Sequence, residues 1–129
     1  MAVSVGHAPS LLAERLPELH AALETYRASA RREIAAAERE LARPAVPEDE
    51  GIAHGAAADL YDRELRLTDI SRFKRELYEI DAALGRMRAG VYGFCVDCGR
   101  PISLDRLVAR PQTARDIDCA RHTEREAAL

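Results

Sequence analysis

A regular apolar repeat between residues 56 and 89 restricts this chain to a small number of folds. Its members are separated alternately by three and four residues: Ile70, Phe73, Leu77, Ile80, Leu84 and Met87. This is the a/d spacing of a heptad, which gathers apolar side chains in one narrow seam along a helix. The repeat predicts a long helix from about Ala56 to Ala89, with Gly90 as its C-cap. Such a seam needs a second helix to cover it.

A helical pattern from residue 10 to about Arg43 can supply that second helix. Its apolar residues recur in steps of four and three and then continue further along the chain: Leu12, Leu16, Leu19, Leu23 and Tyr26, followed by Ile34, Ala37 and Leu41. Pro17 interrupts the pattern and leaves two interpretations open. Either a short turn ends at Leu16 and the long helix begins with Pro17 in its first turn, or one helix kinks at Pro17.

The segment between the two patterns, residues 43–58, contains two prolines, two glycines and the acidic run Glu48-Asp49-Glu50. A short connection of this kind makes neighbouring helices antiparallel. The sequence therefore predicts a long antiparallel coiled-coil helical hairpin over residues 10–89, with an acidic tip loop near 43–58 and a flexible lead at 1–9. At 1.5 Å per residue the hairpin would be roughly 40–50 Å long.

Composition narrows the range of functions. Hydrophobic residues make up 47% of the chain but aromatic residues only 5%, which favours a thin packing seam over a thick core. The formal net charge of −3 argues against binding nucleic acid through bulk electrostatics, and sequence-specific recognition of nucleic acid is not expected. No apolar run approaches the roughly 20 residues of a membrane span. The start of the chain lacks the basic and apolar parts of a secretion signal, so no membrane partner and a cytoplasmic location are expected.

Two of the three cysteines form a C-x-x-C pair, Cys95 and Cys98, directly followed by Gly99. Two thiolates at this spacing can hold one metal ion, and the glycine lets backbone amides turn towards the sulfur atoms. No βαβ pattern surrounds the pair, so a thioredoxin-like redox site is a poor interpretation. A reducing cytosol favours metal over disulfide, and the pair predicts half of a site for one zinc ion.

The other half of the site is less regular. Cys119 is the remaining cysteine, and either Asp116 or His122 could be the fourth ligand. Ligand chemistry alone favours the imidazole of His122, because three thiolates and one histidine form a common structural zinc set. An open site with three thiolates is a third interpretation. With short β-prone pieces around the C-x-x-C pair, residues 90–129 predict a small zinc-ribbon-like knob and a short C-terminal helix, so the overall fold class is expected to be mainly α.

Residues 92–111, YGFCVDCGRPISLDRLVARP, resemble the signature of the DksA/TraR zinc-finger family, and residues 80–90, IDAALGRMRAG, resemble the end of the family's long helix. The resemblance is specific over about residues 62–119. It implies a transcription regulator that binds bacterial RNA polymerase directly and inserts the tip of its hairpin into the secondary channel. The family's zinc pattern has two C-x-x-C pairs with seventeen residues between them, which places the third ligand on Asp116 and the fourth on Cys119.

The resemblance also assigns roles at the tip and on the knob. Family members carry two carboxylates at the tip, for which this chain offers Asp49, Asp59 and Asp62. Arg110 matches an arginine that the family uses for the alarmone ppGpp, and Arg106 is a second candidate for this surface or for a partner. The family lysine after the last cysteine is Ala120 here, so ppGpp binding is expected to be weak or absent.

The resemblance implies a non-catalytic regulator whose main partner is RNA polymerase, and we expect it to be a monomer. A zinc enzyme is a poor alternative, because the chain has no H-E-x-x-H or H-x-E motif. Two non-enzymatic hypotheses share the fold without binding polymerase. One is a coiled-coil adaptor, and the second is a thiol sensor that releases zinc on oxidation.

Overall fold

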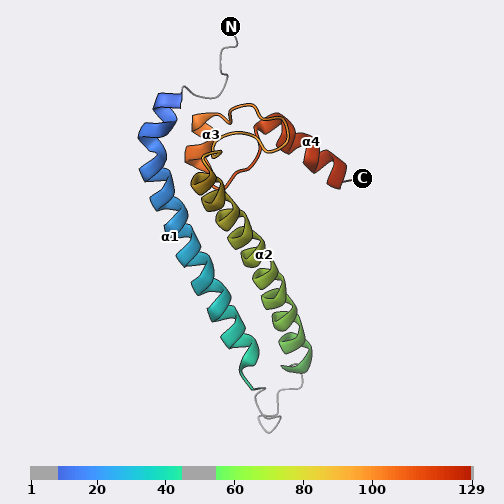
Figure 1. Ribbon diagram of the computed structural model, residues 1–129. Helices are drawn as coiled ribbons and strands as arrows, with labels where there is room; N and C mark the ends of the chain where they lie inside the picture. Colours follow the sequence, from blue (N-terminus) through green and yellow to red (C-terminus); the bar gives the residue numbers. More distant parts are fainter. Residues whose placement is uncertain (1–8, 45–54, 129) are drawn as a thin grey trace. The chain divides into compact units, whose positions relative to one another are not determined.

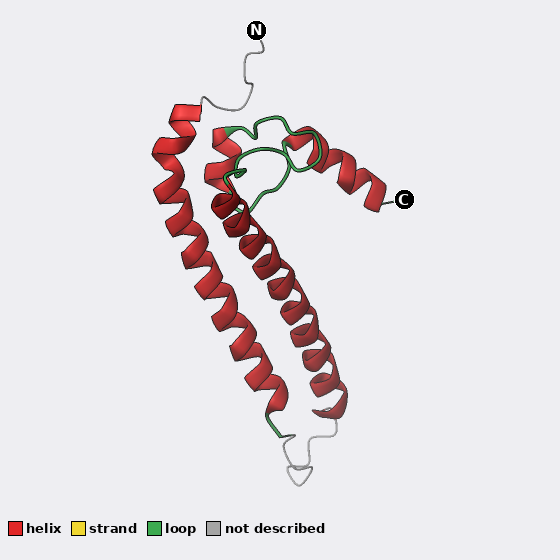
Figure 2. Ribbon diagram, in the orientation of Figure 1, coloured by secondary structure: helices red, strands yellow, loops and turns green. Residues whose placement is uncertain are grey.

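The computed structural model describes residues 9–44 and 55–128 of the chain, and four helices make up most of these residues. They are α1 (Pro9–Ala42), α2 (Gly55–Ala89), α3 (Leu104–Ala109) and α4 (Ile117–Ala127) (Figure 1). Across the described ranges there is no strand, and the only extended pairing is an isolated bridge between Phe94 and Pro101 (Figure 2). The predicted mainly α fold class is confirmed. The predicted lead, except for Pro9, and most of the tip loop lie outside the described residues.

The chain divides into two units, which are described separately. Unit 1 comprises residues 1–27 and 78–129, and unit 2 comprises residues 28–77. Both long helices therefore contribute a segment to each unit. No helix in the described part of the chain combines the length and the apolar character that crossing a membrane requires.

In unit 2, the two long helices run in opposite directions. Polar contacts between them show this, because the residue number falls along α2 as it rises along α1: Glu38 with Lys74 (3.9 Å), Glu40 with Arg66 (3.7 Å), and the Leu41 carbonyl with Arg63 (3.2 Å). These contacts are largely exposed, so each contributes little to stability. Burial of Ala30, Ile34 and Ile70 provides the apolar packing of this unit.

The heptad seam of α2 is confirmed, since its six predicted members are all buried or half-buried. The α1 pattern is correct except at Tyr26, whose side chain is 45% exposed. Ala30 is buried instead, seven residues after the fully buried Leu23. A straight helix with 3.6 residues per turn drifts against a seven-residue repeat, which turns Tyr26 out of the seam.

Pro17 lies inside α1, so the interpretation in which a short turn ends at Leu16 is wrong. A proline inside a helix removes one backbone hydrogen bond, at a cost of about 3 kcal/mol. Leu12 and Leu19, on either side of Pro17, are both buried in the same apolar cluster. Burial of these two side chains offsets the loss, because each contributes roughly 1.5–3 kcal/mol.

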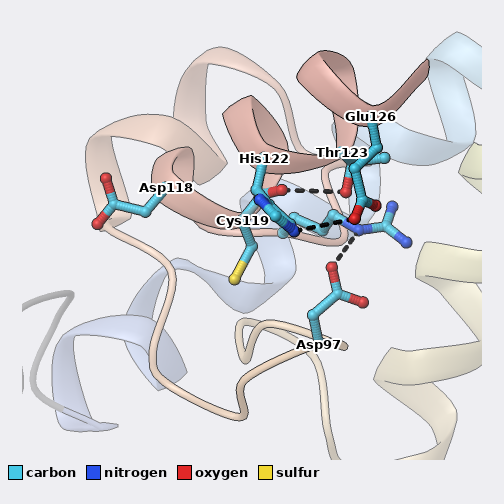
Figure 3. Close-up of a pocket in the computed structure, with 7 residues that line it drawn as sticks. Asp97, Asp118, Cys119, His122, Thr123 and Glu126 are labelled. Atoms are coloured by element: carbon cyan, nitrogen blue, oxygen red, sulfur yellow. Dashed lines mark hydrogen bonds and ion pairs between the residues drawn. The ribbon is translucent and has the colours of Figure 1, made fainter. Parts of the chain in front are cut away.

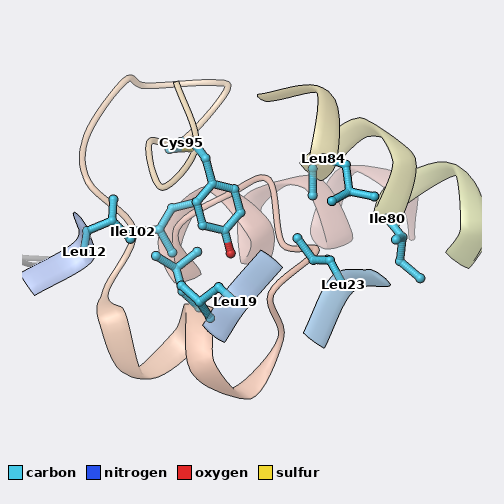
Figure 4. Packing of buried hydrophobic residues seen from close by; sticks show 10 residues of the cluster. Leu12, Leu19, Leu23, Ile80, Leu84, Cys95 and Ile102 are labelled. Carbon is cyan, nitrogen blue, oxygen red and sulfur yellow. The ribbon is translucent and has the colours of Figure 1, made fainter. Parts of the chain in front are cut away.

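The core of unit 1 joins the first half of α1 to the end of α2 and to the segment that follows it (Figure 4). In Figure 4, Leu23 of α1 lies towards Ile80 and Leu84 of α2, and Leu19 lies towards the loop residue Ile102. Cys95, Tyr92 and Leu107 also belong to the cluster. The C-x-x-C segment is therefore anchored directly in the core of unit 1.

Tyr92 is a buried residue whose phenol donates a hydrogen bond to the carbonyl of Pro111 (2.8 Å). Burial raises the pKa of Tyr92 to about 12, although the nearby Arg86 opposes the shift. A raised pKa means that the native state holds the phenolic proton more tightly than the unfolded chain does. The stabilisation is therefore complete below the unfolded pKa of about 10 and is lost as the pH rises towards 12.

We expect Tyr92→Phe to destabilise unit 1 by about 1–3 kcal/mol at pH 8, because the Pro111 carbonyl stays buried without its donor. The variant should also lose less stability than the natural chain between pH 10 and 12. Urea unfolding at pH 8 and at pH 11 measures both effects. Tyr78→Phe is the matched control, since Tyr78 is 75% exposed. Equal losses for the two variants would contradict the prediction.

Candidate metal centre

The site begins where α2 ends, in a Schellman turn. Gly90 has a positive φ of 76°, which favours glycine, and its N–H donates to the carbonyl of Met87 (3.2 Å). The N–H of Val91 donates to the carbonyl of Arg86 (3.0 Å). These two bonds satisfy the last carbonyls of the helix. The predicted C-cap at Gly90 is confirmed, and it turns the chain sharply into the C-x-x-C segment.

The segment from Phe94 to Pro101, which we call the knuckle, folds back on itself through backbone hydrogen bonds. The N–H of Cys95 donates to the carbonyl of Arg100 (2.8 Å), and the N–H of Gly99 donates to the carbonyl of Cys95 (2.9 Å). Gly99 has a φ of 75°, a conformation that L side chains rarely adopt. The turn brings the sulfur atoms of Cys95 and Cys98 to one side of the knuckle.

Asp116 reaches the same place from the start of α4. It is the N-cap of this helix, and its Oδ1 accepts a hydrogen bond from the N–H of Cys119 (2.8 Å). Its Oδ2 accepts a hydrogen bond from the Cys98 thiol (3.0 Å). One carboxylate oxygen therefore starts the helix, while the other lies among the sulfur atoms.

Cys95, Cys98, Asp116 and Cys119 form a single cluster in which the ligand atoms all lie within 4.8 Å of one another. Among the described residues no other group of this kind occurs. In a tetrahedral zinc site, Zn–S bonds of about 2.3 Å place the sulfur atoms roughly 3.8 Å apart. Three thiolates and one carboxylate oxygen at this spacing fit one zinc ion, with the carboxylate as the less common type of ligand.

The thiols of the cluster differ in acidity. Burial opposes ionisation of Cys95, but backbone hydrogen bonds from Cys98, Asp116 and Asp97 outweigh it and hold the pKa of Cys95 below its usual value. Burial, and then hydrogen bonding to the other two thiols, raises the pKa of Cys119 to about 12. A metal ion binds thiolate, so its binding must release the proton of Cys119.

Two charged groups complete the electrostatics of the cluster. The hydrogen bond from Cys98, followed by the one from the Cys119 backbone, lowers the pKa of Asp116. A hydrogen bond to Cys98, together with the negative charges of the cluster, raises the pKa of Arg100. A zinc ion with three thiolates and one carboxylate carries a net charge of −2, and Arg100 places a compensating positive charge beside it.

His122, the second candidate for the fourth ligand, is not part of the cluster. Its Nε2 lies 3.2 Å from Oε1 of Glu126, one helical turn further along α4. Figure 3 shows these two side chains over an open pocket next to Cys119, with Asp118 pointing away from them. The structure therefore brings Asp116, rather than His122, to the three cysteines.

The two arginines expected on a partner or ppGpp surface both have contacts within unit 1. The Nε of Arg106 donates to the carbonyl of Arg115 (2.9 Å), and the Arg106 side chain is only partly exposed. The guanidinium of Arg110 lies 3.0 Å from a carboxylate oxygen of Glu79 on α2. An anionic ligand at Arg110 would have to compete with that carboxylate.

The tip carboxylates lie in unit 2, on α2. Asp59 and Asp62 are both exposed and lie within the first two and a half turns of this helix. Residues three apart in a helix share a face, so the two carboxylates are neighbours. Asp49 lies outside the described residues.

The knob and the overall fold both resemble those of known proteins. Residues 90–125 match the family model described as a prokaryotic dksA/traR C4-type zinc finger. The structure also resembles that of transcription factor DksA2 from Pseudomonas aeruginosa. The TM-score is 0.72 and the sequences are 28% identical, over 90% of this chain and 88% of that one. Residues 90–125 are therefore similar to a C4-type zinc finger, and most of the chain has the fold of DksA2.

Sequence relatives show which proteins this chain resembles over part of its length. The chain is 41% identical over 66 residues to the RNA polymerase-binding transcription factor DksA of Caulobacter vibrioides, covering 50% of this chain and 46% of the relative. An uncharacterized protein of Aquifex aeolicus is 45% identical over 51 residues, or 40% of this chain and 35% of that protein. The chain thus spans about half the length of the curated relatives it matches. These findings confirm the resemblance to the DksA/TraR zinc-finger family, whose named members here are transcription factors.

The family model is of the four-cysteine type, whereas this chain has Asp116 at one of the four positions. The zinc cofactor expected from the sequence agrees with the family and with a cluster that could hold one metal ion. Sequence reasoning did not identify the hydrogen-bond donors that hold the segment before Asp116. They come from Arg86 and Tyr92 as well as Arg106, and nothing in the spacing of the cysteines points to them.

Proposed function

We propose that this protein is a transcription regulator that binds bacterial RNA polymerase directly and has no catalytic activity of its own. The observation that carries the proposal is the match of residues 90–125 to the dksA/traR finger, together with the likeness of most of the chain to DksA2. The near-balance of 19 basic and 22 acidic residues supports contact with a protein rather than with DNA sequence. Such a regulator acts in the cytoplasm.

In this proposal, the finger and α4 dock on the polymerase, and the hairpin tip enters the secondary channel. Asp59 and Asp62 then place two carboxylates near the metal ions of the polymerase active site. Their exposure in unit 2 supports this role, because neither carboxylate is buried against the rest of the chain. The regulator would bind as a monomer, since α1 of the same chain already packs beside the α2 seam in each unit.

The proposal also predicts weak or absent binding of ppGpp. Ala120 offers no positive charge, and Arg110 is already paired with Glu79. Displacing that carboxylate would add to the cost of binding an anion at this position.

The test compares the natural chain with an Asp59→Asn/Asp62→Asn double variant, in binding to core RNA polymerase and in transcription from a set of promoters. We expect the variant to bind with a Kd within about twofold of the natural value, because the proposal assigns docking to the finger and α4 and not to these two carboxylates. It should nevertheless lose its effect on transcription. Glu33→Gln, an exposed change on α1 of the same unit, is the control and should leave both properties unchanged.

Absence of saturable binding at micromolar concentrations would overturn the proposal. Full transcriptional activity of the double variant would exclude these two carboxylates as the acting groups. In the same assay, adding ppGpp should cause no further change, and a clear ppGpp response would contradict the expected weak binding.

A further inference from the structure

The segment before Asp116 is held in an unusual way. Residues 111–115, which we call the return loop, form no helix or strand, yet all five of their carbonyl groups accept hydrogen bonds. The donors come from the end of α2, from Tyr92 shortly after it, from the knuckle and from α3. In the order of the carbonyls they are Tyr92 Oη to Pro111 (2.8 Å), the Arg86 guanidinium to Gln112 (3.5 Å) and Thr113 (3.3 Å), the Val96 N–H to Ala114 (2.9 Å) and Arg106 Nε to Arg115 (2.9 Å).

Arg86 holds two adjacent carbonyls with one nitrogen of its guanidinium. Its side chain lies half-buried on the last turns of α2, and the residues it contacts, Gln112 and Thr113, are buried. Burial lowers the pKa of Arg86, although arginine remains charged at neutral pH. Hydrogen bonds from a charged donor in such a place are stronger than neutral ones. Because this nitrogen reaches both carbonyls, Arg86 links the return loop to the last turns of α2.

Arg106 holds the last carbonyl before the candidate ligand. Its Nε bonds the carbonyl of Arg115, which also accepts a hydrogen bond from Thr113 Oγ1 (3.1 Å). The side chain of Arg115 in turn pairs with Asp97 in the knuckle (2.6 Å). The residue next to Asp116 is thus fixed through both its backbone and its side chain.

We propose that Arg86 and Arg106 are positioning residues for the metal site, which hold the return loop so that the carboxylate of Asp116 meets the three thiols. The inference rests on the assignment of Asp116 as a ligand. Carboxylate is the less common zinc ligand, and a carboxylate on a loosely held loop would lose ordering entropy on binding. Groups that fix a ligand before the metal arrives reduce that cost.

The test measures zinc affinity by competition with a chromophoric chelator. We expect Arg86→Gln to raise the Kd for zinc about tenfold, because outer groups that orient ligands typically contribute 10–100-fold. Arg86→Lys should recover part of the affinity, since it keeps the charge and the aliphatic stem but not the guanidinium nitrogen that reaches both carbonyls. If Arg86→Gln fails to fold, the zinc affinity of Arg86→Lys tests the inference instead. Arg88→Gln is the matched control, because Arg88 is exposed on the same helical turn.

A double-mutant cycle with Asp116→Ala separates positioning from general destabilisation. If Arg86 acts through Asp116, Arg86→Gln should have no effect on zinc affinity once Asp116 is alanine. The absorption of bound Co²⁺, which reports tetrahedral coordination, should change in Arg86→Gln and not in Arg88→Gln.

Three outcomes would overturn the inference. An equal effect of Arg86→Gln in both backgrounds would mean that Arg86 only stabilises the fold. If Arg86→Gln leaves the Kd for zinc unchanged while Asp116→Ala raises it, the positioning role is overturned and Asp116 remains a ligand. An unchanged Kd in Asp116→Ala would overturn the ligand assignment and the inference together. None of these results depends on binding to RNA polymerase.

Discussion

Cys95→Ser will lose most of its zinc affinity, and the packing of unit 1 will weaken with it. Cys95 is only 3% exposed, belongs to the core cluster, and receives backbone hydrogen bonds that favour its thiolate. A serine hydroxyl does not ionise at neutral pH, so one of four ligands is lost. Structural zinc binds with about 10–16 kcal/mol in finger peptides, so losing one ligand should raise the Kd on the order of a hundredfold or more.

Chelator competition measures this loss, and thermal unfolding with and without zinc measures its effect on the fold. In the natural chain, zinc should raise the melting temperature, because an ion that binds only the native state stabilises it. In Cys95→Ser the shift should largely disappear. His122→Asn is the control and should keep its zinc, since His122 pairs with Glu126 outside the cluster. A similar loss in the two variants would return His122 to the ligand set.

Leu23→Ala will have the largest effect of any single apolar change on α1. Its side chain is fully buried in the apolar cluster, which also contains Ile80 and Leu84 of α2. Truncating a buried leucine removes transfer free energy and leaves a cavity, which together cost about 2–5 kcal/mol. For a protein with a narrow apolar seam, this is a large part of the total stability.

Urea unfolding of the zinc-loaded protein measures the change, with the metal concentration held fixed so that binding does not shift the result. Leu11→Ala provides the comparison within the same helix, because Leu11 is 49% exposed and should cost less than about 1 kcal/mol. A loss at Leu23 no larger than at Leu11 would show that the core of unit 1 is not organised as described.

The long helices could be predicted from spacing because their seams bury apolar residues at a fixed period. The observed ends of α2 differ from the predicted ends by one residue at the start and by none at the end, since Gly90 gives a strong local signal. Tyr26 was predicted wrongly, because a repeat read from sequence does not show where the helix drifts out of register. The sequence also could not decide whether Pro17 lies inside the helix, since that depends on the burial of the leucines on both sides of it.

The knob was harder to predict. Residues rich in Val, Tyr, Phe and Ile suggested short β pieces, but the described part of this region contains only one isolated bridge. Tyr92 and Ile102 pack instead in the cluster with residues of α1 and α2, whereas Val91, Phe94 and Val96 are exposed. The six-residue α3 was missed. Its one local signal is Ser103, whose side chain accepts a hydrogen bond from the N–H of Arg106. A single N-cap before so short a helix is weak evidence in a sequence.

The candidate metal ligands could be placed by counting from the C-x-x-C pair, because metal geometry restricts spacing. Ligand chemistry alone favoured His122, and only the fold shows that its ring lies with Glu126. The contacts of Arg106 and Arg110 could not be foreseen. Which arginine donates to a carbonyl and which to a carboxylate depends on how the return loop crosses the end of α2.

The double use of Asp116 bears on how this position can vary. Aspartate is among the best residues for starting a helix, whereas a thiol is a weak hydrogen-bond acceptor. A cysteine in the same place would give the ion a softer, stronger ligand but would leave the N–H of Cys119 without the carboxylate that now accepts it. An aspartate at this position therefore favours the start of α4, whereas a cysteine would favour retention of the ion. A lineage that met scarce zinc could shift this balance by changing a single residue, without rebuilding the knob.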